Sequence, residues 1–209
     1  MPVDAPLYPV NLVVAGRRCL VVGGGRVALQ KARGLAEAGA ELTVVAPAVE
    51  PALEALATVE RRPYRRGEVA GYWLAVAATG DPAVNQQVYD DGEAARVWVN
   101  SADDPERCSV TLPALLRRGR LTVTVSTAGH SPAIAAWLRD HLAGELGEEY
   151  DALIGVLADV RNGLRAEGRS TEGLDWRRAL DSGILDLVRA GRLEDAKERV
   201  SACLSSSSD

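Results

Sequence analysis

The sequence predicts an α/β fold in which a doubly wound parallel sheet is followed by a β/α segment and a helical end. Apolar runs alternate with amphipathic stretches as far as residue 100, as strands alternate with helices around a parallel sheet. Three glycines, residues 23–25, stand directly between an apolar strand and the helix that follows it. Beyond residue 132 the apolar residues follow a helical period almost throughout.

The first hundred residues predict the strands of the sheet and the helices between them. The expected elements are a strand near 8–14, a strand at 18–22, a helix from 26 onward, a strand at 41–47, a helix at 48–57, an extended stretch at 58–64, a strand at 72–80, a helix at 81–95 and a strand at 96–100. One face of the first helix carries Val27, Ala28, Lys31, Ala32 and Leu35. Gly39 ends that helix, and Asp81 with Pro82 begins the helix at 81–95.

The second half changes character. Residues 107–127 predict two β runs joined through 114–120, and later helices are expected at 133–146, 150–168, 174–180 and 193–204. Ser131 is the expected N-cap of the first of these helices and Pro132 its first residue. The predicted divisions are 1–113, 114–147 and 148–209, and the serine-rich tail is expected to be disordered.

Composition excludes several classes of protein. The chain has 209 residues and a formal net charge of -5, which argues against a general nucleic-acid binder because phosphate neutralisation needs a basic surface. No apolar run approaches a membrane span, and the N-terminus lacks a basic start followed by an apolar stretch, so we expect a cytoplasmic protein with no membrane partner. The three cysteines are far apart, which predicts neither a disulfide framework nor a metal site, and Cys19 is expected to be buried.

The glycine-rich turn predicts a dinucleotide site. Gly23, Gly25 and Ala28 form a GxGxxA pattern in which the first residue permits a tight turn, the second admits a pyrophosphate and the third lets the helix pack on the strand. The helix N-terminus then offers N–H groups and partial positive charge to the phosphates, so Gly24, Arg26 and Val27 join the predicted site. This makes the fold Rossmann-like; the alternative is a tight turn without a ligand.

The second strand of this site lacks one expected feature. An Asp or Glu usually follows about 20 residues after the glycines to bind the adenosine ribose, whereas the chain has Ala46, Pro47 and Ala48 there. Neither is there an arginine for a 2′-phosphate, so NAD bound through the backbone near Pro47 and Ala48 is preferred to NADP. Thr79, at the end of the strand at 72–80, is a further predicted contact to the cofactor.

Four stretches together carry a resemblance to a known family. They are "GRRCLVVGGGRVALQKARGLAEAGAELTVVAP" at 16–47, "AATGDP" at 77–82, "VNSADDPERCSVTLPALLRRGRL" at 99–121 and "VSTAGHSPAIAAWLR" at 125–139. In order and spacing the chain resembles the precorrin-2 dehydrogenase family, which includes dehydrogenase/ferrochelatases and the N-terminal half of bacterial sirohaem synthase. The resemblance covers about residues 7–145 and implies NAD-dependent oxidation of precorrin-2 to sirohydrochlorin by a homodimer whose middle segments, here 114–147, intertwine.

The resemblance also implies site residues. The family's important aspartate maps to Asp103 and its asparagine to Asn100, with the adjacent Asp104 as a departure from the pattern. A carboxylate can accept the proton that accompanies hydride loss, or stabilise the cation that is left, so Asp103 is the predicted catalytic residue and Asn100 a substrate contact. The simpler alternative is that both aspartates cap a turn before Pro105.

Further substrate contacts are predicted beyond residue 113. Thr127 occupies a position where the family has a serine or threonine near the presumed tetrapyrrole, and His130 is a weaker candidate in the same loop. Because a carboxylate-rich tetrapyrrole needs local positive charge, the remaining predicted contacts are Arg117, Arg118 and Arg120. Each arginine has the alternative of an exposed turn residue.

Two other functions share parts of this pattern. The same enzyme could also insert Fe(II) or Co(II) into sirohydrochlorin, because both activities would use one carboxylate. A non-catalytic NAD-sensing module would share the glycine turn, but it would not need the stretches that contain Asp103 and Thr127. A helical docking protein, with residues 150–209 as its working part, is a further alternative.

Overall fold

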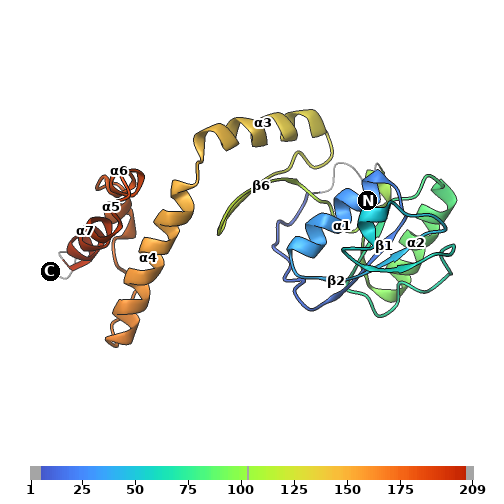
Figure 1. Cartoon of the computed structure of the whole chain (residues 1–209), viewed down its shortest axis with the longest axis horizontal. Helices are drawn as coiled ribbons and strands as arrows, with labels where there is room; N and C mark the ends of the chain where they lie inside the picture. The colour runs from blue at the N-terminus through green and yellow to red at the C-terminus, as the bar shows by residue number, and fades with distance from the viewer. Residues whose placement is uncertain (1–5, 103, 206–209) are drawn as a thin grey trace. The chain divides into compact units, whose positions relative to one another are not determined.

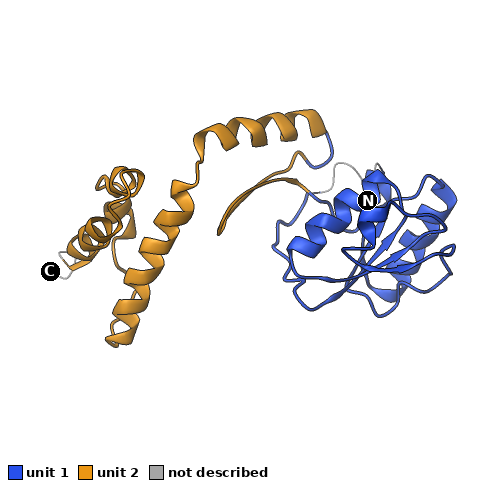
Figure 2. Cartoon of the chain, viewed as in Figure 1, with its two compact units in different colours: residues 1–112, 128–131 blue, residues 113–127, 132–209 orange. Residues whose placement is uncertain are grey.

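The computed structural model describes residues 6–102 and 104–205, and these residues form two compact units. Unit 1 comprises Met1–Leu112 and Ala128–Ser131, whereas unit 2 comprises Pro113–Thr127 and Pro132–Asp209 (Figure 2). The chain therefore leaves unit 1 after Leu112, returns to it for a short loop and leaves it again.

Unit 1 is built on a five-stranded parallel sheet in the order β3-β2-β1-β4-β5 (Figure 1). Its elements in chain order are β1 (Arg18–Val22), α1 (Arg26–Glu37), β2 (Glu41–Val45), the 3₁₀ helix η1 (Pro51–Leu53), β3 (Thr58–Glu60), β4 (Leu74–Ala77), α2 (Pro82–Ala95), β5 (Trp98–Ser101) and the 3₁₀ helix η2 (Pro105–Arg107). The chain moves outward from β1 through β2 to β3, then crosses to β4 on the other side of β1. This is the switch of direction that a doubly wound sheet has.

The two faces of the sheet carry separate hydrophobic cores. Ala28 and Ala32 of α1 pack with one core, and Val88 of α2 is fully buried in the other. Cys19 is 0% exposed in the first core, which confirms its predicted burial. Burying a side chain of the size of Val88 contributes roughly 1.5–3 kcal/mol. The predicted fold class, a Rossmann-like sheet with a helical end, is confirmed.

Two predicted elements of unit 1 are wrong. Residues 8–14 form no strand, and Tyr8 and Val13 are 88% and 79% exposed because no neighbouring strand pairs with them. The helix predicted at 48–57 is reduced to the single 3₁₀ turn Pro51–Leu53, of which only Leu53 is buried. Parts of both segments pack on the first core through Val14 and Leu53, but a strand also needs a neighbour to pair with, and a short helix is not stable by its local pattern alone.

Unit 2 begins with a two-stranded antiparallel hairpin of β6 (Ala114–Arg118) and β7 (Leu121–Val125). Residues 114–120 are therefore not a connection between two β runs, as predicted; most of them form β6 itself. The turn lies at Gly119, whose φ of +52° is a conformation that suits glycine. The helices that follow are α3 (Pro132–Glu145), α4 (Glu149–Ala166), α5 (Trp176–Leu180), α6 (Ile184–Arg189) and α7 (Leu193–Ser205).

The last four helices share a core of their own. Ile184, Val200 and Leu204 are at most 1% exposed and pack with Leu153 and Val156 of α4. The helix α6 was absent from the sequence prediction, although Ile184 is among the largest fully buried side chains. Residue Ser205 ends α7, and the rest of the predicted disordered tail lies outside the described residues. Among residues 6–102 and 104–205, no helix has the length and apolar character needed to cross a bilayer.

Candidate functional site

Three loops meet at the carboxyl edge of the unit 1 sheet, around the first two glycines of the turn. Gly23 has a φ of +125°, and a Cβ added there would overlap the carbonyl of Ala78, directly after β4. A Cβ on Gly24 would overlap the carbonyl of Ala48, in the loop after β2. Both glycines are therefore required by the packing of the protein's own backbone.

Gly25 differs from its neighbours because a Cβ added there would meet nothing within 4 Å. Its φ of -87° is open to any residue, so neither packing nor backbone strain explains a glycine. Gly25 is the N-cap of α1 and no side chain caps that helix. Free space, uncapped N–H groups and the positive end of the helix dipole fit the pyrophosphate of a dinucleotide.

The other predicted cofactor residues border this place. Arg26 and Val27 lie exposed in the first turn of α1 and line a depression with Leu29, Gln30 and Arg33. Pro47 and Ala48 are exposed in the loop that touches Gly24, and that loop is tied to the turn because Glu50 N–H donates to the Gly24 carbonyl at 2.8 Å. The structure thus brings these predicted residues to one edge of the sheet.

Thr79 lies in the turn between β4 and α2, against the glycine turn. Its hydroxyl donates to Asn85 Oδ1 at 2.7 Å and accepts from Asp81 N–H at 3.1 Å. Asp81 is the N-cap of α2, as predicted, because its carboxylate accepts from Ala83 N–H at 2.9 Å. Sequence reasoning missed Asn85, although its place in the first turn of a helix begun by Asp81 and Pro82 was a usable signal.

Asn100 is buried at 6% exposure and is engaged with backbone. Its Nδ2 donates to the Val110 carbonyl at 3.0 Å and approaches Cys108 Sγ at 3.5 Å. These contacts fasten the segment that follows β5 to the sheet. The structure therefore gives Asn100 a framework role, and its predicted contact to substrate stays a prediction.

The predicted catalytic residue, Asp103, lies outside the described residues. Its neighbour Asp104 is occupied locally: its carboxylate accepts from Glu106 N–H at 3.1 Å as the N-cap of η2, and it forms a close ion pair with Arg107. Asp104 therefore caps the turn before Pro105, as the simpler alternative predicts for it. An aspartate held in this way has little freedom to serve a substrate.

Cys108 also holds the segment that follows β5, through contacts with Ser101 and Asp104. Its Sγ accepts from Ser101 N–H at 3.3 Å and lies 3.2 Å from the Asp104 carbonyl, to which the thiol can donate. Burial raises the pKa of this thiol, so it stays protonated and is unsuited to act as a nucleophile. Within the described residues, Ser101 Oγ is a buried side-chain oxygen that has no hydrogen-bond partner.

The arginines predicted to bind substrate belong to unit 2, and two of them have structural duties. Arg118 donates to the carbonyls of Leu146 and Ala143 at 3.2 and 3.3 Å, where it caps the end of α3. Arg120 donates through Nε and its backbone N–H to Asp151 Oδ1 at 2.9 and 2.7 Å. Arg117 is exposed on β6.

The Arg120–Asp151 pair predicts a pH-dependent stability of unit 2. Hydrogen bonds from the Arg120 side chain and backbone lower the pKa of Asp151 from 3.8 to about 2. A lowered pKa means that the contribution is fully present above the usual value and is lost as the pH falls through the folded-state value. We expect the stability difference between wild type and Asp151→Asn to be largest above pH 4, to shrink as the pH falls toward 2 and to vanish below it, as measured by thermal unfolding.

The matched control for this experiment is Asp181→Asn. The Asp181 side chain follows α5 and is 74% exposed, and its carboxylate lies 3.8 Å from Arg177, so this surface pair contributes little to stability. Its substitution is expected to leave the thermal midpoint nearly unchanged across the same pH range. An Asp151→Asn difference that stayed constant between pH 5 and pH 2 would contradict the assignment.

The loop between β7 and α3 divides between the units. Thr127 is the last residue of the hairpin segment in unit 2, whereas His130 lies in the stretch that belongs to unit 1. A Cβ added at Gly129 would lie 3.9 Å from the Pro105 ring, so the His130 loop adjoins η2. The other histidine, His141, is exposed on α3 and stacks on Trp137 with ring centroids 5.6 Å apart.

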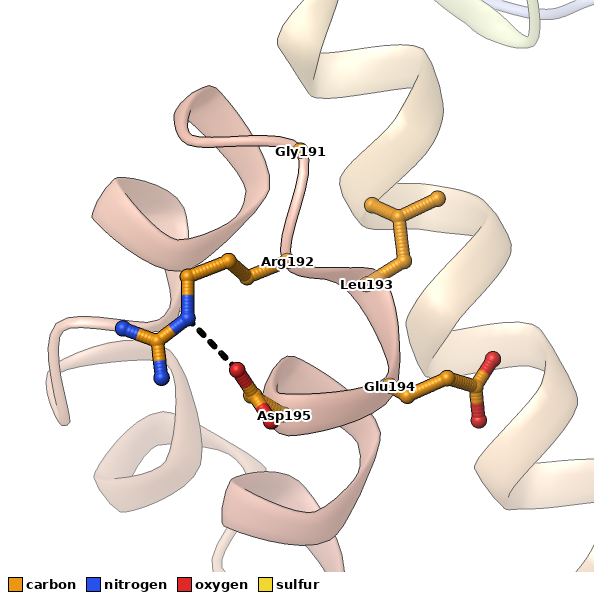
Figure 3. A pocket seen from close by; sticks show the side chains of 5 residues that line it. All are labelled: Gly191, Arg192, Leu193, Glu194 and Asp195. Carbon is orange, nitrogen blue, oxygen red and sulfur yellow. Dashed lines mark hydrogen bonds and ion pairs between the residues drawn. The ribbon is translucent and has the colours of Figure 1, made fainter.

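A shallow pocket elsewhere in unit 2 offers no comparable chemistry. It is lined by Gly191, Arg192, Leu193, Glu194 and Asp195, at the start of α7 (Figure 3). Arg192 is already paired with Asp195 at 2.5 Å, as the dashed line shows. Among residues 6–102 and 104–205, no group of three or more His, Cys, Asp or Glu side chains is placed to hold a metal ion.

Comparison with known proteins agrees with this geometry. An NAD(P)-binding family model matches residues 10–114, and a model described as the central part of sirohaem biosynthesis proteins matches residues 118–145. The chain is 34% identical over 203 residues to the sirohaem synthase of Nitrosococcus oceani and 43% identical over 151 residues to that of Azotobacter vinelandii. These alignments cover 94% and 70% of this chain.

A solved structure extends the likeness over both units. SirC, a precorrin-2 dehydrogenase, superposes with a TM-score of 0.73 at 26% identity, covering 94% of this chain and 100% of SirC. The chain belongs to the precorrin-2 dehydrogenase and sirohaem synthase family. The predicted resemblance is thereby confirmed, and unit 1 is the family's domain for a nicotinamide cofactor. The chain corresponds to 43% and 32% of the length of the two sirohaem synthases.

Proposed function

We propose that the protein oxidises precorrin-2 to sirohydrochlorin in sirohaem or cobalamin biosynthesis, with NAD as the hydride acceptor. The observation that carries the proposal is Gly25, an unconstrained glycine at the uncapped start of α1, in a chain similar to SirC over almost its whole length. We place the reaction in the cytoplasm, where free cysteines such as Cys19 and Cys108 are kept reduced.

Different residues of the chain bind the cofactor, orient it and accept the proton. The first turn of α1 holds the pyrophosphate, Gly25 leaves room for it, and Thr79 orients the nicotinamide half. The bound cofactor supplies a place for the hydride that leaves the macrocycle. Asp103 accepts the proton that accompanies this loss, so that precorrin-2 and NAD⁺ give sirohydrochlorin, NADH and H⁺.

The preference for NAD over NADP rests on the end of β2. After Val45 the chain continues with Ala46, Pro47 and Ala48, which offer neither a carboxylate for the ribose nor a guanidinium for a 2′-phosphate. The adenosine half is therefore held mainly through backbone. Titration with NADH and NADPH, followed by nucleotide fluorescence, tests this: tighter binding of NADPH would contradict the preference.

An anaerobic absorbance assay tests the reaction itself. Purified protein is mixed with freshly made precorrin-2 and NAD, and the spectra of sirohydrochlorin and NADH are followed together. Equimolar appearance of both, faster than the spontaneous oxidation, supports the proposal. NADH formation that does not exceed the protein-free control would overturn it, and Fe(II) or Co(II) added to sirohydrochlorin in a separate arm tests for a chelatase activity.

We further propose that the protein is a homodimer assembled through unit 2. Ile134 and Trp137 are 53% and 64% exposed on one side of α3, and Leu115 is 40% exposed on the hairpin. Large apolar side chains on adjoining elements are typical of a surface that another chain covers. The double substitution Ile134→Glu and Trp137→Glu is expected to convert a dimer into a monomer in sedimentation velocity, whereas Leu180→Glu, on α5, is expected to leave the dimer intact.

A further inference from the structure

Asn85 is a buried polar side chain directly beneath the turn between β4 and α2. It is 8% exposed and lies in the first turn of α2. Burying an amide costs free energy unless its polar atoms are hydrogen-bonded. A buried amide in such a place needs partners for its oxygen and for its nitrogen. The turn above it supplies both.

All the described side-chain hydrogen bonds of Asn85 go to one residue, Thr79. Its Oδ1 accepts from the Thr79 backbone N–H at 3.2 Å and from the Thr79 hydroxyl at 2.7 Å. Its Nδ2 donates to the Thr79 carbonyl at 3.1 Å. Asn85 thus fixes the backbone and the χ1 rotamer of Thr79 at the same time.

The same turn is held from the opposite side by the glycine motif. Ala78 N–H donates to the Val22 carbonyl at 2.8 Å, and a Cβ added on Gly23 would lie only 2.3 Å from the Ala78 carbonyl oxygen. The turn therefore lies between Gly23 and Asn85 with little room to move. Any change in its conformation alters the wall of the cofactor site next to α1.

We infer that Asn85 is a positioning residue for the nicotinamide cofactor, acting through Thr79 and the turn between β4 and α2. This inference rests on the proposed function, because it takes that turn as one wall of the dinucleotide site. Asn85 does not touch the cofactor itself. Its role is to hold Thr79 and the backbone of residues 78–81 in the conformation that accepts the dinucleotide.

Substitution by aspartate separates this role from simple packing. Asp has the size of Asn and keeps an oxygen for the two donors of Thr79, but an ionised carboxylate places a second oxygen against the Thr79 carbonyl, where Nδ2 now lies at 3.1 Å. Protonation of that oxygen restores a donor. Burial raises the pKa of such a carboxyl, so the carboxyl becomes protonated, and can donate again, within an accessible pH range.

The experiment is a fluorescence titration of the full chain with NADH between pH 5 and pH 8, for the wild type and Asn85→Asp. The ratio of the two dissociation constants is expected to be about tenfold at pH 8, the effect of roughly one lost buried hydrogen bond, and to fall toward one as the pH is lowered. In steady-state assays the KM for NAD rises with little change in kcat. Asn85→Ala, which removes all three bonds at once, is expected to weaken NADH binding equally at every pH.

Val88→Ala is the matched control on the same helix. It opens a cavity at a fully buried position of α2 and lowers the stability of unit 1, but it does not touch Thr79. Its NADH affinity is expected to equal that of the wild type. A ratio for Asn85→Asp that stays at one, or that does not change with pH, overturns the inference, as does an equal loss in Val88→Ala. Failure of the wild type to bind NADH would instead overturn the proposed cofactor site, and this inference with it.

Discussion

Asp103→Ala is expected to lower kcat for precorrin-2 oxidation by on the order of 10²–10⁴-fold while NADH still binds with wild-type affinity. The reason is chemical: hydride loss leaves a cation whose proton must go to a base, and Asp103 is the proposed base. The measurement is the initial rate of anaerobic sirohydrochlorin formation at saturating NAD, together with a fluorescence titration with NADH.

Asp104→Ala provides the comparison for this variant. Asp104 caps η2 and pairs with Arg107, so its loss is expected to cost about 1 kcal/mol of unfolding free energy and to reduce kcat much less than Asp103→Ala does. Asp103→Asn separates charge from size, since it keeps the shape and removes the base. Full activity in Asp103→Ala, or a larger loss of rate in Asp104→Ala, would show that the catalytic assignment is wrong.

Gly25→Val is expected to weaken NADH binding on the order of 100-fold while lowering the thermal midpoint only by the small cost of a poorer N-cap residue. A Cβ at Gly25 meets no protein atom within 4 Å and the φ of -87° suits any residue, so a side chain can begin here without a clash or backbone strain. The added atoms occupy the space that a pyrophosphate needs against the N–H groups of α1. Losing one or two hydrogen bonds to a charged group accounts for an effect of about this size.

Two other glycines serve as controls for Gly25. Gly34 lies in α1 with open space around it, so Gly34→Ala is expected to stabilise the protein by roughly 0.5–1 kcal/mol and to leave NADH binding unchanged. A Cβ at Gly24 overlaps the Ala48 carbonyl, so Gly24→Ala is expected to lower both stability and binding. Equal NADH affinity in Gly25→Val and wild type would mean that the dinucleotide does not lie at this turn.

The sheet could be predicted because its three interior strands are short apolar runs with clear ends. The runs ending at Val22 and Val45, and the one that ends before Gly80, lie in the interior of the sheet and pack on both faces. Residues 8–14 have a similar composition but no neighbour to pair with, and pairing is a property of the whole fold. The first strand of the hairpin was predicted too early in the chain for a related reason. Its turn lies at Gly119, and residues 114–118, which were predicted as the connection, form β6 by pairing with β7.

The site could be predicted only as far as local sequence determines chemistry. The glycine turn is local, and its three members can be named from the sequence, but the difference between Gly24 and Gly25 depends on whether Ala48 lies nearby. Arg120 was identified by its charge, whereas its partner Asp151 lies 31 residues further along the chain. Asn85 was missed because an amide becomes informative only when its burial and its partners are known.

The return of residues 128–131 to unit 1 has a consequence for how the protein can be divided. A gene fragment that stops at residue 113 would encode unit 1 without residues 128–131. A fragment that starts at residue 132 would encode unit 2 without the hairpin of β6 and β7. Each unit consists of two separate stretches of the chain. Dividing the chain at one position is therefore not expected to yield either unit complete.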